Sequence, residues 1–584
     1  MTAETRVCQN CKTSFTIEPE DFEFYAKIKV PAPTFCPECR YWRRLVDRNE
    51  WNLYRRKCDM IGEQIVSIYR EDVPFPVYKQ DAWRSDAWDP LAYGRDFDFN
   101  RHFFEQFQEL RNVVPHLALV SSNSVNSEYS NQSQDNKDCY MVSATGGSEK
   151  CMYGNWYQPG SYFCADCYMI EKSERCYECI NCGRCASTTF SQDCFDCVSC
   201  HFSFDCRGCT ECFGCVGLRN KQYCWFNEQL SKEEYAKRLE AFTWSRPVIE
   251  ETKKKVREFA KHFPRKFYHG AKNEGSFGDY LENTSYARLS FNCRENRDTA
   301  YLQDAWKMID CLDMTEILGS ERSYEIQGCA DVYRSIGLRS CWTMNDCYYC
   351  DMTFSSSDCF GCFGLKQKQY CILNKQYSKE DYHALKEKII EHMKKTGEWG
   401  EYFPPKGSSF AYNESVAYDF FSLSESEAQK RGYRWYTPAV REYNVTVKAS
   451  ALPLTIDQAQ DSILKEVIGC VSQETEEGRL AYPECATAFR LIPLELDLYR
   501  ELKLPIPQKC FPCRRRDRFS VRNPRKLWGR HCQCQGALSI LGNYTNASEH
   551  FHGDKPCPNE FKTSYAPERP EIVYCEQCYQ NEVV

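Results

Sequence analysis

Residues 176–185 read CYECINCGRC, and residues 212–224 read CFGCVGLRNKQYC, a stretch that returns as CFGCFGLKQKQYC at residues 359–371. Most cysteines in these stretches follow one another at intervals of three residues. In a straight strand, residues three apart point to opposite faces, so thiols that share one side require a corner at about every triad. The pattern predicts a narrow, tightly wound coil.

The cysteines also repeat at a longer spacing of 18 residues. The members of this repeat are Cys164, Cys182 and Cys200; Cys176, Cys194 and Cys212; Cys293, Cys311, Cys329 and Cys347; and Cys341 and Cys359. A fixed period with turn-forming residues and without helical periodicity is typical of a β-solenoid. We therefore expect two solenoid blocks of about five 18-residue coils each, at residues 137–228 and 284–375. Thiols 18 residues apart would then form columns.

Each block runs into a helix start, QLSKEEY or QYSKEDY. Ser231 with Glu234, and Ser378 with Asp381, have the spacing of a capping box. We expect a short capping helix after each block, within the segments 229–283 and 376–469.

The two ends of the chain are a second duplicated pair. One constant offset of 474 aligns Cys11, Cys36, Cys39 and Cys58 with Cys485, Cys510, Cys513 and Cys532. After an insertion of 22 residues, the match resumes at an offset of 496. We expect each end, residues 1–83 and 470–584, to be a tandem of zinc-ribbon or treble-clef-like modules, with an aromatic, mixed-charge connector at 84–136. The predicted fold is mainly β, with two cysteine-rich solenoid blocks flanked by these modules.

The C-x-x-C pairs of the end modules supply thiolate knuckles of the kind that close a tetrahedral zinc site. In the C-terminal copy Tyr482 takes the position of Cys8, and Cys470 is the natural replacement. In the last module Cys532 and Cys534 compete for one ligand position, and the sequence leaves that choice open. The three predicted sets are Cys8, Cys11, Cys36 and Cys39; Cys470, Cys485, Cys510 and Cys513; and Cys532 or Cys534 with Cys557, Cys575 and Cys578.

These sets predict about three structural zinc ions for each chain. In the second N-terminal module, Ile61, Lys79 and Ala82 stand where the last module has cysteines, so Cys58 is alone and the module is expected to have lost its metal. The solenoid thiols allow two interpretations, either small buried hydrophobes or further metal ligands from adjacent coils.

Two basic runs follow the knuckles. Residues 40–57 carry a local charge of +5 and residues 509–530 carry +8, in a chain of net charge −7. Such patches on zinc modules predict contacts with the phosphates of a nucleic acid, with RNA favoured over DNA. The alternative is a face that pairs with the acidic middle of the chain. The candidate contacts are Arg40, Arg43, Arg44, Arg55, Arg56, Arg514, Arg515, Arg516, Arg518, Arg525 and Lys526.

Composition narrows the class of protein. The 584 residues are 27% charged and contain 39 cysteines, and no apolar run approaches the ~18 residues of a spanning helix. The N-terminal stretch MTAETRVCQNC lacks the features of a signal peptide, so we expect a cytoplasmic protein whose cysteines are thiols and metal ligands. There is no H-E-x-x-H, P-loop or dinucleotide-binding fingerprint. We therefore expect no enzyme.

The CQNC and CPECR motifs, the CFGC repeats and the closing YAPERPEIVYCEQCY resemble the zinc-ribbon, cysteine-repeat proteins that are common in Candidate Phyla Radiation bacteria. The resemblance spans nearly the whole chain and implies structural zinc and a bacterial cytoplasm. In that family the second N-terminal module resembles a full C-x-x-C pair, from which Ile61, Lys79 and Ala82 depart here.

These observations predict a non-enzymatic zinc-binding scaffold that binds nucleic acid through its basic faces. Two alternatives stay open, a protein-assembly scaffold that docks partners on its solenoid faces and a thiol-based metal store or redox buffer.

Overall fold

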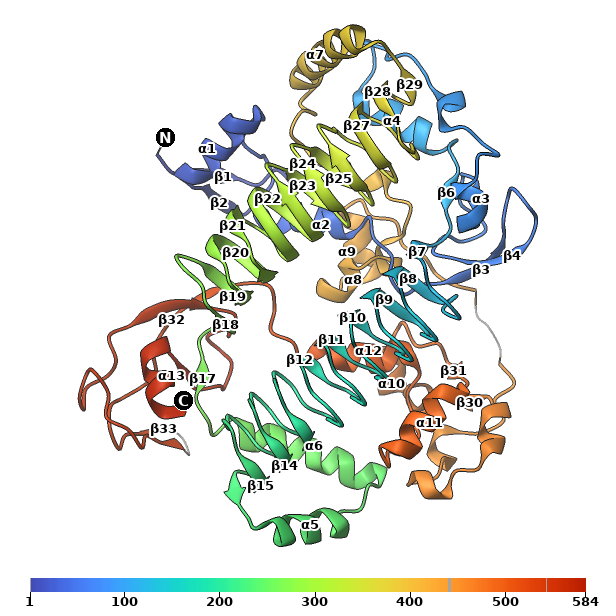
Figure 1. Ribbon diagram of the computed structural model, residues 1–584. Coiled ribbons are helices and arrows are strands. Elements are labelled where there is room, and N and C mark those ends of the chain that lie inside the picture. Colours follow the sequence, from blue (N-terminus) through green and yellow to red (C-terminus); the bar gives the residue numbers. More distant parts are fainter. Residues whose placement is uncertain (1, 440–442, 542–543, 584) are drawn as a thin grey trace.

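The computed structural model describes residues 2–439, 443–541 and 544–583. It is mainly β, and its core is a pair of solenoid blocks of about 21 turns in total, which lie side by side (Figure 1). The indole rings of Trp156 and Trp306 meet across the seam at 5.5 Å, and Arg294 forms an ion pair with Glu171. The predicted fold class is confirmed.

The first block begins at Ser121 and ends in an antiparallel hairpin. Its strands are β7 (Ser121–Ser122), β8 (Ser130–Gln134), β9 (Val142–Gly146), β10 (Asn155–Tyr157), β11 (Tyr168–Glu171), β12 (Ile180–Gly183), β13 (Val198–His201), β14 (Thr210–Phe213), β15 (Gln222–Trp225) and β16 (Glu228–Gln229). Strands β7 to β12 form one sheet of parallel neighbours and β13 to β16 form another, in which only β15 and β16 are antiparallel. Single parallel bridges such as Ile180 with Gln192 continue the coil between β12 and β13.

The second block has the same design. Its strands are β18 (Gly270–Ala271), β19 (Phe277–Glu282), β20 (Ser285–Arg294), β21 (Arg297–Ala300), β22 (Gln303–Glu321), β23 (Tyr324–Gln327), β24 (Ala330–Tyr333), β25 (Ile336–Arg339), β26 (Trp342–Asn345), β27 (Phe354–Phe360), β28 (Gln369–Ile372) and β29 (Lys375–Gln376). They form one 12-stranded sheet that also ends in an antiparallel hairpin, β28 with β29.

The coil length is 12 residues rather than 18. Cys200 pairs with Cys212, which pairs with Cys224, and the rungs of the second block show the same step. The predicted 18-residue coil is therefore wrong, and so are the predicted columns, because residues 18 apart are one and a half coils apart and lie on different sides of the coil. The prediction fails because a coil closes after four triads, and the residues of one triad do not indicate how many triads form a coil.

The predicted corner at each triad is confirmed. In the stretch 176–185, Glu178, Asn181 and Arg184 adopt left-handed backbone, with φ of 49°, 51° and 52°. Side chains other than glycine rarely adopt this conformation because Cβ crowds the backbone. Parallel hydrogen bonds from the coils on both sides hold each corner in place, for example from Arg184 N–H to the carbonyl of Glu171 at 2.7 Å.

The residue after each corner points into the coil and is buried. Cys200, Cys212 and Cys206 are fully buried, and Thr188 and Ser191 take equivalent inward places. Four inward side chains fill each coil. Those of the first block are mainly cysteine, serine and threonine, whereas the second block also uses larger apolar residues such as Leu302, Met314 and Ile326. Aromatic side chains instead stack along the outside, as in Phe213 over Trp225 at 4.0 Å.

The two ends fold alike. The N-terminal modules contain β1 (Glu4–Val7), β2 (Ser14–Ile17), α1 (Pro19–Ile28), α2 (Pro37–Leu45), β3 (Tyr54–Lys57), β4 (Gln64–Ser67), β5 (Val77–Tyr78) and α3 (Gln80–Arg84). The C-terminal modules contain β30 (Ile468–Gly469), β31 (Ala488–Phe489), α11 (Pro493–Glu501), α12 (Phe511–Ser520), β32 (Trp528–His531), β33 (Ile540–Leu541), β34 (Tyr544–Thr545), β35 (Glu560–Thr563), β36 (Val573–Tyr574) and α13 (Glu576–Val583).

The second module of each end lies where one block ends and the other begins. β5 pairs with β6 (His116–Leu117) just before the first block, and Trp83 contacts Phe354 near the end of the second block. In the same way β36 pairs with β17 (Arg265–Lys266) before the second block, and Tyr579 bonds to Asp205 of the first. The two blocks and the second module of each end therefore form a closed ring (Figure 1).

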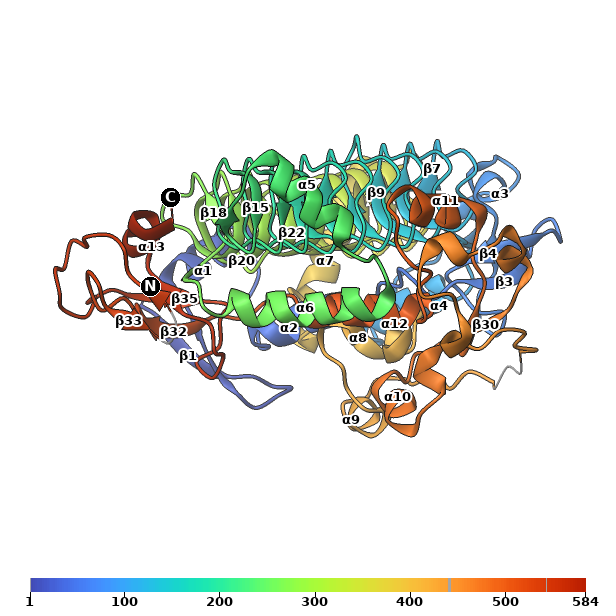
Figure 2. The ribbon, with the colours of Figure 1, turned by 90° about the horizontal axis from the view of Figure 1, so that it is seen from below.

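The remaining helices connect these parts. They are α4 (Phe103–Arg111), α5 (Lys232–Ala241), α6 (Arg246–Ala260), α7 (Lys379–Thr396), α8 (Ala417–Phe420), α9 (Glu425–Lys430) and α10 (Glu476–Ala481). Ser231 caps α5 by accepting from Glu234 N–H, and Ser378 caps α7 by accepting from Asp381 N–H, so the capping helices are confirmed. In Figure 2, α2, α6, α8 and α12 form a layer against one face of the two solenoids.

Candidate metal centres

The first module brings Cys8, Cys11, Cys36 and Cys39 together, with all four Sγ atoms within 4.8 Å of one another. The turn between β1 and β2 carries one pair, and Cys36 caps the start of α2. The Sγ atoms of Cys11 and Cys36 lie 3.7 Å apart. Sulfurs bound at about 2.3 Å around a tetrahedral zinc ion are about 3.8 Å apart. The spacing fits a metal and is far longer than the ~2.05 Å of a disulfide.

The C-terminal copy gathers Cys470, Cys485, Cys510 and Cys513 in the same way. Sulfur–sulfur distances of 3.5, 3.6 and 3.9 Å again match the edges of a thiolate tetrahedron. Cys470 lies at the place of the missing ligand, as predicted. Tyr482, at the position of Cys8, turns away and donates to Asp517 at 2.6 Å.

The last module forms a third set from Cys532, Cys557, Cys575 and Cys578. Cys532 therefore takes the position aligned with Cys58. Cys534 joins a different set, with His550, His552 and the same Cys578, and its four ligand atoms also lie within 4.8 Å.

Sequence reasoning missed the two histidines. They belong to the 22-residue insertion, which has no counterpart in the N-terminal copy. The signal was present as a C-x-C pair at Cys532 and Cys534 followed by an H-x-H pair at His550 and His552.

A backbone amide donates to a knuckle sulfur in every module. Cys36 N–H donates to Cys8 Sγ at 3.3 Å, Cys510 N–H to Cys470 Sγ at 3.3 Å, and Cys575 N–H to Cys532 Sγ at 3.2 Å. Such bonds favour the thiolate that binds a metal.

The second N-terminal module keeps this bond without the other cysteines. Lys79 N–H donates to Cys58 Sγ at 3.3 Å, and Trp83 is buried beside it. Ile61, at the position of Cys557, is exposed. The module has the hairpin and helix of its copy in the last module without the other three cysteines.

The solenoid thiols have a different environment. Among the described residues, they form no group of three or more ligand atoms that all lie within 4.8 Å of one another. Their S–H groups instead donate to backbone carbonyls of their own or the next coil, as Cys179 does to Thr188 at 3.2 Å. Burial raises the pKa of Cys293 and that of Cys311 to about 12, which keeps both thiols protonated and unreactive.

The basic runs form contacts within the chain. Nine of the eleven predicted phosphate contacts make an ion pair with an acidic residue of this protein: Arg40 with Asp313, Arg43 with Glu401, Arg44 with Glu325, Arg56 with Asp59, Arg514 with Glu495, Arg515 with Asp419, Arg516 with Glu484, Arg518 with Asp166, and Arg525 with Asp304. Arg55 and Lys526 are exposed. Seven of these nine arginines pair with acidic residues between 166 and 419, as the alternative of a face that pairs with the acidic middle of the chain predicts. Arg56 and Arg516 pair within their own end of the chain.

These ion pairs repeat the duplication of the chain. Arg40 and Arg44 of α2 both contact Asp313 in the second block, at 2.9 and 3.3 Å. Arg514 and Arg518, which follow them by the 474-residue offset, both contact Asp166 in the first block, at 3.3 and 2.5 Å. Asp166 precedes Asp313 by 147 residues, the offset between the blocks. Each end module thus docks on the solenoid block farther from it in sequence.

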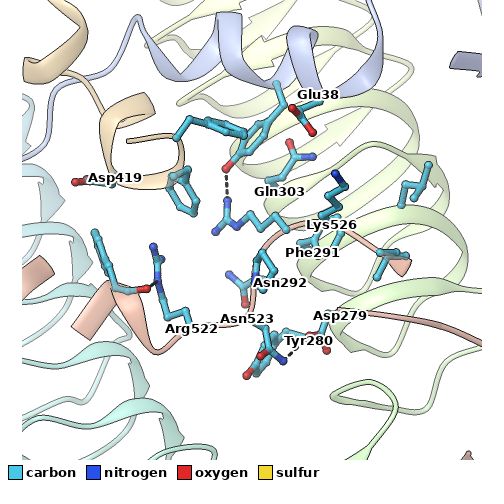
Figure 3. A pocket seen from close by; sticks show the side chains of 18 of the residues that line it. Glu38, Asp279, Tyr280, Phe291, Asn292, Gln303, Asp419, Arg522, Asn523 and Lys526 are labelled. Atoms are coloured by element: carbon cyan, nitrogen blue, oxygen red, sulfur yellow. Dashed lines mark hydrogen bonds between the residues drawn. The ribbon is translucent and has the colours of Figure 1, made fainter. Parts of the chain in front are cut away.

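A cavity of about 450 Å³ lies where α2, α8, the segment after α12 and both blocks meet (Figure 3). Its lining mixes charged and amide groups with aromatic rings. Arg525 crosses it and donates to the Tyr41 hydroxyl at 2.6 Å and to Asp304 at 2.7 Å. The guanidinium of Arg522 stacks 3.7 Å from the Phe519 ring. Arg525 therefore ties the C-terminal module to α2 and to the second block.

A histidine joins the blocks beside a second cavity of about 190 Å³. His269 Nδ1 lies 2.9 Å from Asp279, and its Nε2 lies 3.8 Å from Asp193 of the first block. Burial alone would lower the pKa of His269, but these two carboxylates raise it to about 9. Burial raises the pKa of Asp193 to about 6. His269 is therefore a cation at neutral pH that bridges the blocks.

A scan against family models found no match for this chain, and a search of curated proteins found none either. No helix within the described ranges combines the length and the apolar character that crossing a membrane requires.

Proposed function

We propose that the protein is a non-enzymatic, zinc-stabilised scaffold in which metal-bound end modules clamp two solenoid blocks into one ring. Three tetracysteine sets supply the zinc sites. Their thiolate donors and spacing suit zinc, which favours four sulfur ligands in structural sites.

The observation that carries the proposal is the position of the docking helices. Cys36 and Cys510 occupy the N-cap positions of α2 and α12, so each helix starts at a candidate metal ligand. One turn later, Arg40 of α2 and Arg514 of α12 each form an ion pair with a buried aspartate of the solenoid block that is farther away in sequence. A metal that orients the knuckle therefore also orients the helix that closes the ring.

Chelation tests this role. In the full chain, removal of zinc with a strong chelator should increase hydrogen exchange in α2 and α12 and in the segments of the blocks that they contact, while the inner coils stay protected. Restored zinc should restore protection. Metal content near zero in protein purified without chelators, or unchanged exchange after full zinc removal, would contradict the proposal.

Nucleic-acid binding through the predicted residues would require nine of the eleven to leave ion pairs within the chain. If the zinc-loaded protein binds RNA and DNA at low salt, and if Arg514→Glu weakens that binding without destabilising the fold, the structural role proposed for these arginines is wrong.

A further inference from the structure

The last module holds two candidate metal sets that share one residue. Cys578 belongs to both sets: it forms one with Cys532, Cys557 and Cys575 and the other with Cys534, His550 and His552. Six of these seven residues are buried and His552 is half-buried. Seven ligands are the number that two tetrahedra with one common corner require.

His550 has the orientation of a metal ligand. Its Nε2 lies 2.9 Å from a carboxylate oxygen of Glu582, and its side chain is fully buried. Within the described chain its Nδ1 is buried without a hydrogen-bond partner. A neutral imidazole that donates from Nε2 keeps a lone pair on Nδ1, and metal-bound histidines commonly donate their other nitrogen to a carboxylate in this way. An unpaired buried nitrogen is costly unless something binds it.

His552 shows the same division of its two nitrogens. Nδ1 lies 2.6 Å from the carbonyl of Lys555, which fixes the ring, and Nε2 lies 3.3 Å from Cys578 Sγ. The nitrogen that faces the shared sulfur is therefore free to bind a metal.

The surrounding contacts hold this second set in place. Asn546 donates to Cys534 Sγ at 3.2 Å, and the Tyr574 hydroxyl donates to Asn546 at 2.6 Å. Glu582, which orients His550, also accepts from the backbone amides of Ala547 and Ser548, both at 3.0 Å. These bonds order the insertion around the ligands.

We propose that the last module binds two zinc ions, with Cys578 as a bridging thiolate between a tetrathiolate site and a Cys534–His550–His552 site. The proposal rests on the proposed function because the tetrathiolate site is one of its three. Two Zn²⁺ ions balance four of the five thiolate charges, which lowers the charge that a buried tetrathiolate site alone would carry.

Zinc analysis of the full chain tests the bridge, because Cys578 should be a ligand of two zinc ions. The unmodified protein should contain about four zinc ions. His552→Ala and Cys534→Ser should each lose about one, Cys575→Ser about one, and Cys578→Ser about two. His531→Ala is the matched control, since this histidine of the same module is exposed and should change nothing.

Cadmium NMR gives an independent measurement that does not depend on the folding of a variant. In ¹¹³Cd-substituted protein, two resonances of the last module should split each other through the shared sulfur. About three zinc ions with no loss in His552→Ala, or cadmium signals without mutual coupling, would overturn the bridge and leave the three-zinc scaffold standing. A content near zero would overturn the scaffold as well.

Discussion

Arginine is the residue that ties the end modules to the solenoids. Arg44 and Arg518 are buried together with their partners Glu325 and Asp166. A buried ion pair gains little over apolar packing because both charges lose water, but the loss of one partner leaves the other charge unpaired. The arginines therefore make the docking specific, and their removal is expected to cost far more than the removal of a surface charge.

Arg518→Ala should lower the free energy of unfolding by about 1–3 kcal/mol, since buried Asp166 would lose its closest cation and keep only Arg514 at 3.3 Å. Arg55→Ala, at an exposed position of the other end, should change it by less than about 0.5 kcal/mol. Urea unfolding followed by tryptophan fluorescence measures both. Equal effects of the two substitutions would contradict the docking role.

His269 makes stability depend on pH. Its pKa of about 9 in the folded state exceeds the ~6.5 of an unfolded chain, so its contribution is complete below about pH 6.5 and is lost as pH rises through 9. The change corresponds to about 3 kcal/mol. Asp193, with its pKa near 6, titrates below this window.

The urea midpoint should therefore fall between pH 7 and 9.5 in the unmodified protein. His269→Gln should show a smaller fall over the same interval, because glutamine does not titrate. Parallel curves for the two proteins would show that His269 is not the group responsible.

At the scale of elements, the knuckle and the helix that follows it act as one unit. The same hairpin, knuckle and helix occur in the first and third modules, and each helix presents its arginines on the side that meets a solenoid. The second module has the same elements without the other candidate ligands, and its Trp83 is buried against Trp88 and Phe354.

Cys36→Ser should release about one zinc ion and loosen α2, because it removes a ligand and disturbs the start of the helix. Cys58→Ser should leave the metal content unchanged. Atomic emission analysis of both variants, beside the unmodified protein, provides the comparison. Loss of a full equivalent in Cys58→Ser would mean that the second module binds metal.

The solenoid coil shows how much of a fold a local sequence pattern can predict. One inward residue in every triad indicates a corner at every triad, and the stretch CYECINCGRC alone predicted these corners. The number of corners in a coil depends on which triads pair through backbone hydrogen bonds. Because all triads look alike, the 18-residue recurrence of cysteine suggested six, whereas pairing of Cys200 with Cys212 shows four.

At the scale of the whole molecule, closure of the ring removes the open ends of both solenoids. A solenoid exposes unpaired backbone groups at its terminal coils, which favours association with other chains. Here an antiparallel hairpin ends each block, β15 with β16 and β28 with β29, and an end module covers each junction. The molecule is thus protected against end-to-end assembly.

This burial predicts the reactivity of the thiols. Alkylation of the native, zinc-loaded protein should leave the solenoid cysteines unmodified, since they are buried and bonded to carbonyls. Chelation should expose only the cysteines of the end modules, and denaturation should expose all 39. Mass spectrometry after each step counts the labels. Rapid labelling of solenoid thiols in the native state would instead favour the redox-buffer alternative.

The sequence by itself determined the solenoid class, the capping serines, the duplicated ends and the first two tetracysteine sets, because each depends on residue types at short spacing or on a constant offset between copies. In the third set it left Cys532 and Cys534 as alternatives, and the structure places Cys532 there. Only the tertiary structure decided the 12-residue coil, the burial of Arg40 and Arg514 against opposite blocks, and the place of His550 and His552 beside Cys578. These features depend on contacts between residues that are distant in the chain. Charge and spacing alone do not state whether an arginine meets solvent, a phosphate or an aspartate of the same protein.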